Sequence, residues 1–539
     1  MPALANFLTL LLDRLLFVAY ACAAGGLVWS LLLCRPWGLG APAELRLAHR
    51  SMALLRWGAM GMALAQLARL AVQAWLLAEL FQRSPFPAFL YTLQCQAGLT
   101  RVLLAGLLAA GGIWVERRPQ GLLHWGMLGG LAVSLAATGA WLSHAVARDE
   151  TRAFLMSSTA LHHLAVAVWV GGVIQLSLLW RHTRHQPEMQ SLWPALVRRF
   201  AWVGGPAMLG SLATGLPLAW TYIGTRQGLT GTDYGVMVLI KAVLLVGTLS
   251  LATLSFLGAR DHRAMKVFQL IPYYVEIETL LLIAIMIVAV GLSAQPPAID
   301  VADCQATGSE VYEAFRPKVP RLTSPSYAEA VAAFPSKAFR GDGVRAGVGS
   351  RWSDYNHNVS GLFVVITAML ALASQMRGVP WARHWPVGFI ALSVFTVLRS
   401  DAGDSWPSGH LGFWEGMLGS DEILLHRLGA LIACALGVVE WRARVNGNAG
   451  SRLPYVIPGL CAVGGLLLLS HSHTGFQPKE EFLVQISHHA IGVLAVIMAC
   501  GRWLELRLTP PAGRLAGVVF MSALLLVGLI LLFYRETPV

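Results

Sequence analysis

Histidine is the residue type whose placement in this sequence points most directly to chemistry. The chain has 16 histidines, and ten of them lie near the same predicted side of the apolar segments. These ten are His144, His162, His163, His357, His410, His426, His471, His473, His488 and His489. A neutral imidazole is a good ligand for copper, zinc and iron, and burying it in a membrane costs less than burying a charge. The pattern predicts at least one metal or haem site.

Two groups of these histidines are the candidate metal ligands. His144 ends one apolar segment and His162 lies about two turns into the next, so antiparallel neighbours would carry both at similar depth. The second group comprises His357, His426, His471, His473 and His488. Its sharpest signal is the His471-Ser472-His473 step, since residues two apart in extended backbone point to one side. On a helix the two rings would diverge by about 200°, so this prediction requires that the helix has ended there.

Charged residues in or beside apolar segments form a second class of candidates, with Lys241 in one segment and Glu276 and Glu278 in another. Such residues either pair with one another or line a water-filled path, and both interpretations stay open. Asp401 and Glu480 lie near the outer histidines. Their carboxylates could orient imidazole rings by hydrogen bonding.

The sequence lacks the motifs that are typical of several kinds of functional site. The seven cysteines form neither a CxxC nor a CxxCH pattern, which argues against thiolate zinc sites and c-type haem attachment. There is no Walker A pattern, no G-x-G-x-x-G in a βαβ context and no H-E-x-x-H. ATP-driven pumping and zincin proteolysis are therefore not expected, and the chain is not expected to be an enzyme unless it carries haem.

The elements that must position these residues are transmembrane helices. The chain has 539 residues, of which 56% are hydrophobic and 13% charged, whereas soluble domains carry roughly 45–50% apolar and about 25% charged residues. This composition excludes a soluble enzyme and predicts an all-α, polytopic membrane protein. The net charge of +12 is expected to face anionic lipid, and no nucleic-acid partner is predicted.

About fourteen segments are long and apolar enough to be predicted as spans. They are approximately 10–34, 57–80, 95–115, 122–145, 155–180, 200–222, 234–258, 271–294, 358–376, 385–400, 421–441, 453–471, 484–501 and 515–534. One alternate set of short connecting loops holds three times as many Lys and Arg residues as the other short loops together with the C-terminal tail. By the positive-inside rule, both termini are predicted to lie outside.

The stretch 295–357 is the predicted domain boundary, because it is polar and contains several prolines. It would separate an eight-helix half, 1–294, from a six-helix half, 358–539. The charge bias also places this stretch outside. It is expected to be an extracytoplasmic loop or a small cap.

Several motifs in the first half resemble the copper-resistance protein D (CopD) family of bacterial inner-membrane proteins. Ser143-His144-Ala145 is similar to that family's G-H-A step, and the stretch 162–172 is similar to a helix that opens with His and closes on W-x-G-G. Arg199-Phe200, Thr214-Gly215, Asp233-Tyr234-Gly235 and Lys241 follow in the order of the CopD domain, about 195–294.

Motifs in the second half continue the resemblance in a specific order. They are Tyr355-Asn356-His357, Arg399-Ser400-Asp401 with Trp406-Pro407, His426-Arg427, His471-Ser472-His473 with Lys479-Glu480-Glu481, and His488. The family often carries a second His where Asn358 stands, and His163 and His489 do not clearly match family positions. The resemblance implies copper handling at the inner membrane, as uptake or delivery, with a periplasmic copper-binding partner of the CopC type.

Two other functions stay open at this point. Histidines on antiparallel helices at matching depth could be axial ligands of haem b, which would make the protein a membrane cytochrome that transfers electrons. Alternatively, the chain could be a metal-free scaffold for copper-enzyme assembly.

Overall fold

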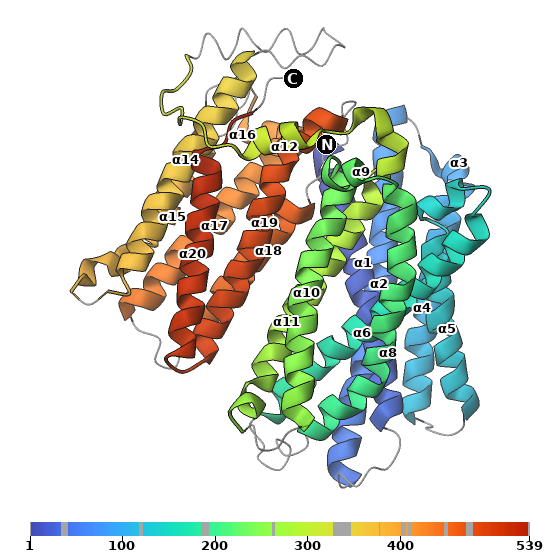
Figure 1. Cartoon of the computed structure of the whole chain (residues 1–539). Coiled ribbons are helices and arrows are strands. Elements are labelled where there is room, and N and C mark those ends of the chain that lie inside the picture. The colour runs from blue at the N-terminus through green and yellow to red at the C-terminus, as the bar shows by residue number, and fades with distance from the viewer. Residues whose placement is uncertain are drawn as a thin grey trace. The chain divides into compact units, whose positions relative to one another are not determined.

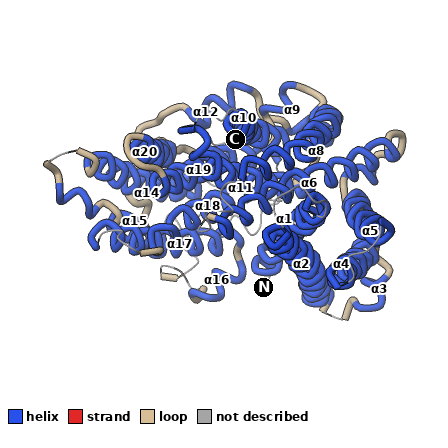
Figure 2. Tube along the Cα trace, turned by 90° about the horizontal axis from the view of Figure 1, so that it is seen from below, coloured by secondary structure: helices blue, strands red, loops and turns tan. Residues whose placement is uncertain are grey.

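The structure is a computed structural model that describes most of the chain. The described residues are 2–33, 41–82, 84–117, 122–184, 193–260, 265–326, 347–376, 378–399, 406–407, 409, 411–446, 451–470 and 478–536. All the secondary-structure elements assigned in these ranges are helices, and Figure 2 shows the chain as helices joined by loops. The all-α prediction is confirmed for these residues.

Eleven of the described helices are long and apolar enough to cross a membrane, by length and composition. They are α1 (Pro2–Leu33), α2 (Ala41–Phe81), α4 (Leu93–Arg117), α5 (Leu122–Ala140), α6 (Arg152–Thr183), α10 (Asp233–Arg260), α11 (Met265–Ala294), α14 (Gly347–Ala373), α17 (Asp421–Asn446), α19 (Pro478–Arg507) and α20 (Ala512–Leu532). Figure 1 shows these long helices along the chain. The protein is therefore a multi-pass membrane protein.

The other three predicted spans are also helical. They correspond to α8 (Trp193–Ile223), α15 (Val387–Arg399) and α18 (Val456–Ser470). At 1.5 Å per residue, α15 and α18 are about 20 and 23 Å long, shorter than a hydrocarbon core of about 30 Å. The helix α8 contains Pro206 and Pro217. The count of fourteen and the placement of the termini stay predictions.

The helices divide into two compact units. The amino-terminal unit comprises Leu8–Gly224 and Ile240–Ser293, and the carboxy-terminal unit comprises Met1–Phe7, Thr225–Leu239 and Ala294–Val539. Shorter elements connect the long helices: α3 (Phe86–Leu90), η1 (His144–Ala147), α9 (Arg226–Thr230), η2 (Ala298–Cys304), α12 (Gly308–Phe315), η3 (Pro380–His384), α16 (Phe413–Gly419) and η4 (Leu453–Tyr455). The predicted division into two halves with an outer loop stays a prediction.

Small residues let the helices of the amino-terminal unit approach closely. A Cβ added at Gly171 on α6 would lie 1.8 Å from the carbonyl oxygen of Ala21 on α1, so only glycine fits there. The indole of Trp29 donates a hydrogen bond to the Gly172 carbonyl at 2.9 Å. Such close contacts between small residues are typical of helix packing in membranes. They fix α6, which carries His162, against α1.

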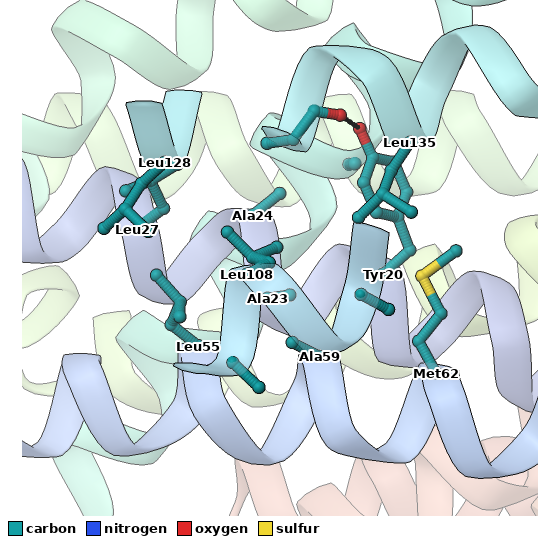
Figure 3. Close-up of a cluster of buried hydrophobic side chains, with 14 of the residues drawn as sticks. Tyr20, Ala23, Ala24, Leu27, Leu55, Ala59, Met62, Leu108, Leu128 and Leu135 are labelled. Atoms are coloured by element: carbon teal, nitrogen blue, oxygen red, sulfur yellow. Dashed lines mark hydrogen bonds between the residues drawn. The ribbon is translucent and has the colours of Figure 1, made fainter. Parts of the chain in front are cut away.

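A second cluster in the same unit joins α1, α2, α4 and α5 through buried apolar side chains. Figure 3 shows Leu55 and Leu108 near the alanines of α1, and Leu135 beside the ring of Tyr20. The Tyr20 hydroxyl donates a hydrogen bond of 2.8 Å to the Ala132 carbonyl, drawn as a dashed line in that figure. The phenol thereby satisfies its polar group inside an apolar core.

Buried polar side chains hold α14 to the end of α20 in the carboxy-terminal unit. The Asn358 amide donates to the carbonyls of Leu531 at 3.2 Å and Tyr534 at 2.8 Å, and its oxygen accepts from the Arg321 N–H. Asp354, which is fully buried, accepts from the Arg321 guanidinium and from the Glu536 N–H. Asn358 therefore joins helices at the position where the family often has a second histidine.

Among the helix boundaries that differ from the sequence-based expectation, two involve candidate histidines. The fourth predicted span was expected to end near 145, but α5 ends at Ala140, so His144 begins the short helix η1 instead of ending α5. The helix α14 begins at Gly347, within the stretch expected to be a loop. Its polar first turns are compatible with a helix because Asp354 and Asn358 are buried against other segments of the protein.

Candidate metal centre

Two histidines of the carboxy-terminal unit, on α14 and α19, lie against each other. The ring of His357 lies 5.6 Å from the ring of His488 between centroids, with an angle of 88° between their planes. The Tyr534 ring lies 4.2 Å from that of His357 and 6.4 Å from that of His488. Residues far apart in the sequence thus bring two predicted ligands and one phenol together.

The backbone fixes which ring nitrogen of each histidine carries the proton. The Nδ1 of His357 lies 2.8 Å from the carbonyl of Ser353, and the Nδ1 of His488 lies 3.1 Å from the carbonyl of Val484. A carbonyl can only accept, so in the neutral rings Nδ1 is the donor and Nε2 carries the lone pair. Histidines that bind metals usually donate their other N–H to an oxygen in this way.

The remaining candidates of this unit are placed less completely. His426 on α17 lies close enough to His357 to interact with it electrostatically, and Glu480 lies half-buried in the first turn of α19. His471, His473 and Asp401 lie outside the described residues. The predicted ligand role of the H-x-H step therefore stays a prediction.

In the amino-terminal unit, the CopD-like T-G step contacts His162. The Nδ1 of His162 lies 3.0 Å from the Ser211 carbonyl and 3.1 Å from the Thr214 hydroxyl on α8. A Cβ added at Gly215 would lie 2.9 Å from the ring carbon Cε1, so the glycine leaves room for the imidazole. Here too Nδ1 donates to a carbonyl, which leaves the lone pair on Nε2.

His144 contacts the same helix at a different level. Its ring lies 6.2 Å from that of Tyr222 on α8, eight residues beyond Thr214 in the sequence. Eight residues of helix, slightly more than two turns, correspond to about 12 Å. The contacts of His144 and His162 therefore lie two turns apart along α8.

The charged candidate residues in the apolar segments lie on α10 and α11, which follow one another in the sequence. Lys241 is half-buried on α10 and interacts electrostatically with His162. Glu276 and Glu278 are buried on α11, with 8% and 4% of their surface exposed. Pairing and a pathway role both stay predictions for them.

Across the described part of the chain, no three His, Cys, Asp or Glu side chains gather closely enough to hold a metal ion. A site here would therefore use fewer described side chains, together with water or with the histidines outside the described residues. The assignment of the seven histidines as metal ligands therefore stays a prediction.

Sequence reasoning missed two features of the carboxy-terminal unit. Tyr534 contacts both His357 and His488, and nothing in its sequence context marks it. His489, which was not assigned to a site, lies with its Nδ1 3.9 Å from the Asp233 carboxylate. The only signal for this pair was the Asp233-Tyr234-Gly235 motif.

The helices and the buried imidazoles define a multi-pass helical membrane protein with histidines inside its helical units. Residues 194–292 match the Copper resistance protein D (CopD) family. The chain is also 34% identical over 134 residues to the copper transport protein CutJ of Bacillus subtilis, a match that covers 25% of this chain and 24% of CutJ. No solved structure matches the chain.

These two matches confirm the resemblance to the CopD family. The matched segment contains α8, α10 and most of α11, so it includes the residues that contact His162. The chain spans about a quarter of the length of the curated relative.

Proposed function

We propose that this protein handles copper at the bacterial inner membrane, and that it receives the ion on the extracytoplasmic side through His357 and His488 for uptake or delivery. The observation that carries the proposal is the contact of these two rings, 5.6 Å apart and from different helices. In this proposal the protein is not an enzyme, and copper is its cargo.

The chemistry of the two rings suits copper. Each ring donates Nδ1–H to a carbonyl of its own helix, so Nε2 is the nitrogen that can bind a metal. Imidazole binds copper well. His426, His471 and His473 are proposed to complete the ligands, Asp401 and Glu480 to orient rings, and His144 with His162 to form a second site.

We propose that copper moves inward, because electrostatics favours this direction. A cation that moves inward is favoured by a negative-inside potential, about 2.3 kcal/mol per charge per 100 mV, so ATP hydrolysis is not required. Lys241, Glu276 and Glu278 are proposed to line a path within the amino-terminal unit. A periplasmic copper-binding protein of the CopC type is the proposed donor, as the resemblance implies.

Cellular copper content tests this proposal. Cells that carry the unaltered chain are compared with cells that carry His357→Gln or His488→Gln, with membrane levels of each protein measured. We expect both variants to lose the change in copper content that the unaltered chain causes. The matched control is His182→Gln, because His182 makes the same bond to the carbonyl four residues before it, 2.9 Å, at an exposed helix end.

If cells with either variant had the same copper content as cells with the unaltered chain, the proposed site would be contradicted. A chain that causes no change in copper content at all would contradict copper handling and favour the metal-free scaffold. If His182→Gln lost the change in copper content to the same extent, the loss would not be specific to the facing rings of His357 and His488.

A further inference from the structure

A carboxylate and an imidazole of the carboxy-terminal unit face each other without touching. Asp233 is the first residue of α10, and Thr232 caps that helix by accepting a hydrogen bond from the Gly235 N–H at 3.0 Å. His489 lies in the fourth turn of α19. Its Nδ1 is 3.9 Å from Oδ1 of Asp233. Their side chains are 1% exposed for His489 and 12% exposed for Asp233.

Neither group is satisfied by its surroundings within the described residues. Both ring nitrogens of His489 and Oδ1 of Asp233 are buried without a hydrogen-bond partner. The 3.9 Å between them is too long for a hydrogen bond. A buried polar group left without a partner costs about 1–3 kcal/mol, so the two such atoms that face each other, Nδ1 of His489 and Oδ1 of Asp233, indicate that something else binds between them.

The spacing of the two groups fits an ion held between them. Bonds from a transition metal to imidazole nitrogen and carboxylate oxygen are about 2.0–2.2 Å long. Two such ligands on one ion lie about 3.3 Å apart at a tetrahedral angle and about 4 Å apart at a wide angle. The observed 3.9 Å lies within this range.

A cavity gives an ion access to Asp233. It has a volume of about 170 Å³ and is lined by Asp233, Glu481 and Cys304, among others. One water needs about 10–15 Å³ of such volume, so the cavity has room for several waters that would complete the coordination of an ion. Two carboxylates on its wall favour cations over anions.

The elements around the cavity are held in place by contacts of the same unit. The Ala306 N–H donates to the Gly231 carbonyl at 2.9 Å, which joins the segment after η2 to the start of α10. Lys479 pairs with Glu310 at 2.5 Å, which joins α12 to the first turn of α19. Asp233, Glu481 and Cys304 are thus positioned by structure that does not depend on an ion.

We propose that Asp233 and His489 form a further metal site, separate from those of the proposed function, which binds divalent copper between Oδ1 and Nδ1, with waters of the cavity and Glu481 beside it. Imidazole with carboxylate and water suits Cu²⁺, whereas Cu⁺ prefers thiolate and thioether ligands. The choice of copper rests on the proposed function. The site itself rests on the unsatisfied buried atoms, their spacing and the cavity.

The test is the binding of Cu²⁺ to the purified full chain in lipid nanodiscs, measured by titration and by electron paramagnetic resonance. We expect Asp233→Asn and His489→Gln each to lose one equivalent of bound Cu²⁺, or to weaken it roughly tenfold or more, as loss of a ligand does. The double variant should be no weaker than either single variant. The matched controls are Asp300→Asn on η2 and His182→Gln, which should bind as the unaltered chain does.

Glu481→Gln provides a second route if Asp233→Asn or His489→Gln does not fold, because Glu481 lines the cavity. We expect it to weaken the same equivalent of Cu²⁺ several-fold. If Glu481→Gln and either of the other two variants bound Cu²⁺ as the unaltered chain does, the proposal would be overturned. Water alone would then fill the space between Asp233 and His489.

The failure of this site and the failure of the proposed function give different results. If only the site is wrong, Asp233→Asn and His489→Gln bind Cu²⁺ as the unaltered chain does, while His357→Gln still alters cellular copper. If only the function is wrong, cellular copper is unchanged in every variant, while Asp233→Asn and His489→Gln still lose their Cu²⁺ in nanodiscs.

Discussion

The imidazole of His357 on α14 stands at 88° to the imidazole of His488 on α19, with 5.6 Å between the ring centroids. Each ring is fixed by a bond from Nδ1 to a carbonyl of its own helix. The two helices therefore set the direction of both Nε2 atoms before any ion arrives. Such preorganisation is what a binding site requires.

The first prediction concerns the coupling of these two histidines. In the purified chain, His357→Gln and His488→Gln should each weaken copper binding roughly tenfold, and the double variant should be little weaker than either. Two ligands of one ion should show a coupling energy of about 0.5–3 kcal/mol in a double-mutant cycle. Isothermal titration of the four chains measures it. Additive effects would mean that the two rings serve different ions.

The sequence predicted the helices well because each needs only a run of apolar residues. The alternation of basic loops and the order of the CopD-like motifs were also readable from residue types alone. The end of α5 was not, because Trp141, Leu142 and Ala145 continue its apolar pattern although the helix stops at Ala140. The start of α14 was missed because Asp354 and Asn358 look like loop residues until their partners are known.

The contacts of the candidate site could be predicted only in part. His357 and His488 were identified by residue type, but their contact depends on how α14 and α19 pack. Tyr534 follows the last apolar helix, and its position beside both rings is a tertiary property. The Asp233–His489 pair joins residues 256 positions apart in the sequence, which neither periodicity nor spacing can reveal.

The second prediction concerns a buried ion network between α17 and α19. Glu440, which is fully buried, accepts from Arg502 at 2.8 Å and from Arg444 at 2.6 Å. Glu440→Gln leaves the Arg502 charge buried with less compensation. We expect a loss of about 3–5 kcal/mol in the free energy of unfolding, as when one partner of a buried ion pair is removed.

Thermal unfolding in detergent measures this loss, and Glu505→Gln is its control. Glu505 also accepts from Arg502, at 2.7 Å, but its side chain is 17% exposed, so water can replace part of its charge. Its substitution should lower stability less than Glu440→Gln does. Equal effects of the two substitutions would show that burial does not determine the strength of this network.

The third prediction concerns pH and the contact of α12 with α19. The Lys479 ammonium, 2.5 Å from the Glu310 carboxylate, and the Thr307 N–H lower the pKa of Glu310 from 4.5 to about 2. Because the folded pKa is depressed, this contact stabilises the fold fully above pH 4.5 and loses its effect as the pH falls toward 2. The pair is about one-third exposed, so its contribution is about 0.2–1 kcal/mol.

The difference in unfolding temperature between the unaltered chain and Glu310→Gln measures this contribution. It should be constant from neutral pH down to about 5 and should shrink below pH 4.5. Glu313→Gln is the control, because Glu313 pairs with the exposed Arg316, which directly follows its own helix. If the difference in unfolding temperature grew as the pH fell, the stabilisation could not come from the ionised Glu310 carboxylate.

The fourth prediction concerns the close approach of α1 and α6. Gly171→Ala puts a Cβ 1.8 Å from the Ala21 carbonyl oxygen, so the two helices must separate. We expect a strong fall in the yield of folded protein, measured by size-exclusion chromatography. Gly106→Ala on α4 is the control, because an added Cβ there meets nothing within 4 Å, and it should be neutral or gain up to about 1 kcal/mol. Equal yields from both variants would contradict the packing.

The last prediction decides between copper and haem in the amino-terminal unit. In the proposed function, His144 and His162 bind copper, and a copper ion held by imidazoles has no porphyrin that could give a Soret band. We therefore expect no Soret band from these two residues in the optical spectrum of the purified chain. A Soret band that shifts on reduction and disappears in His144→Ala or His162→Ala would establish the cytochrome instead.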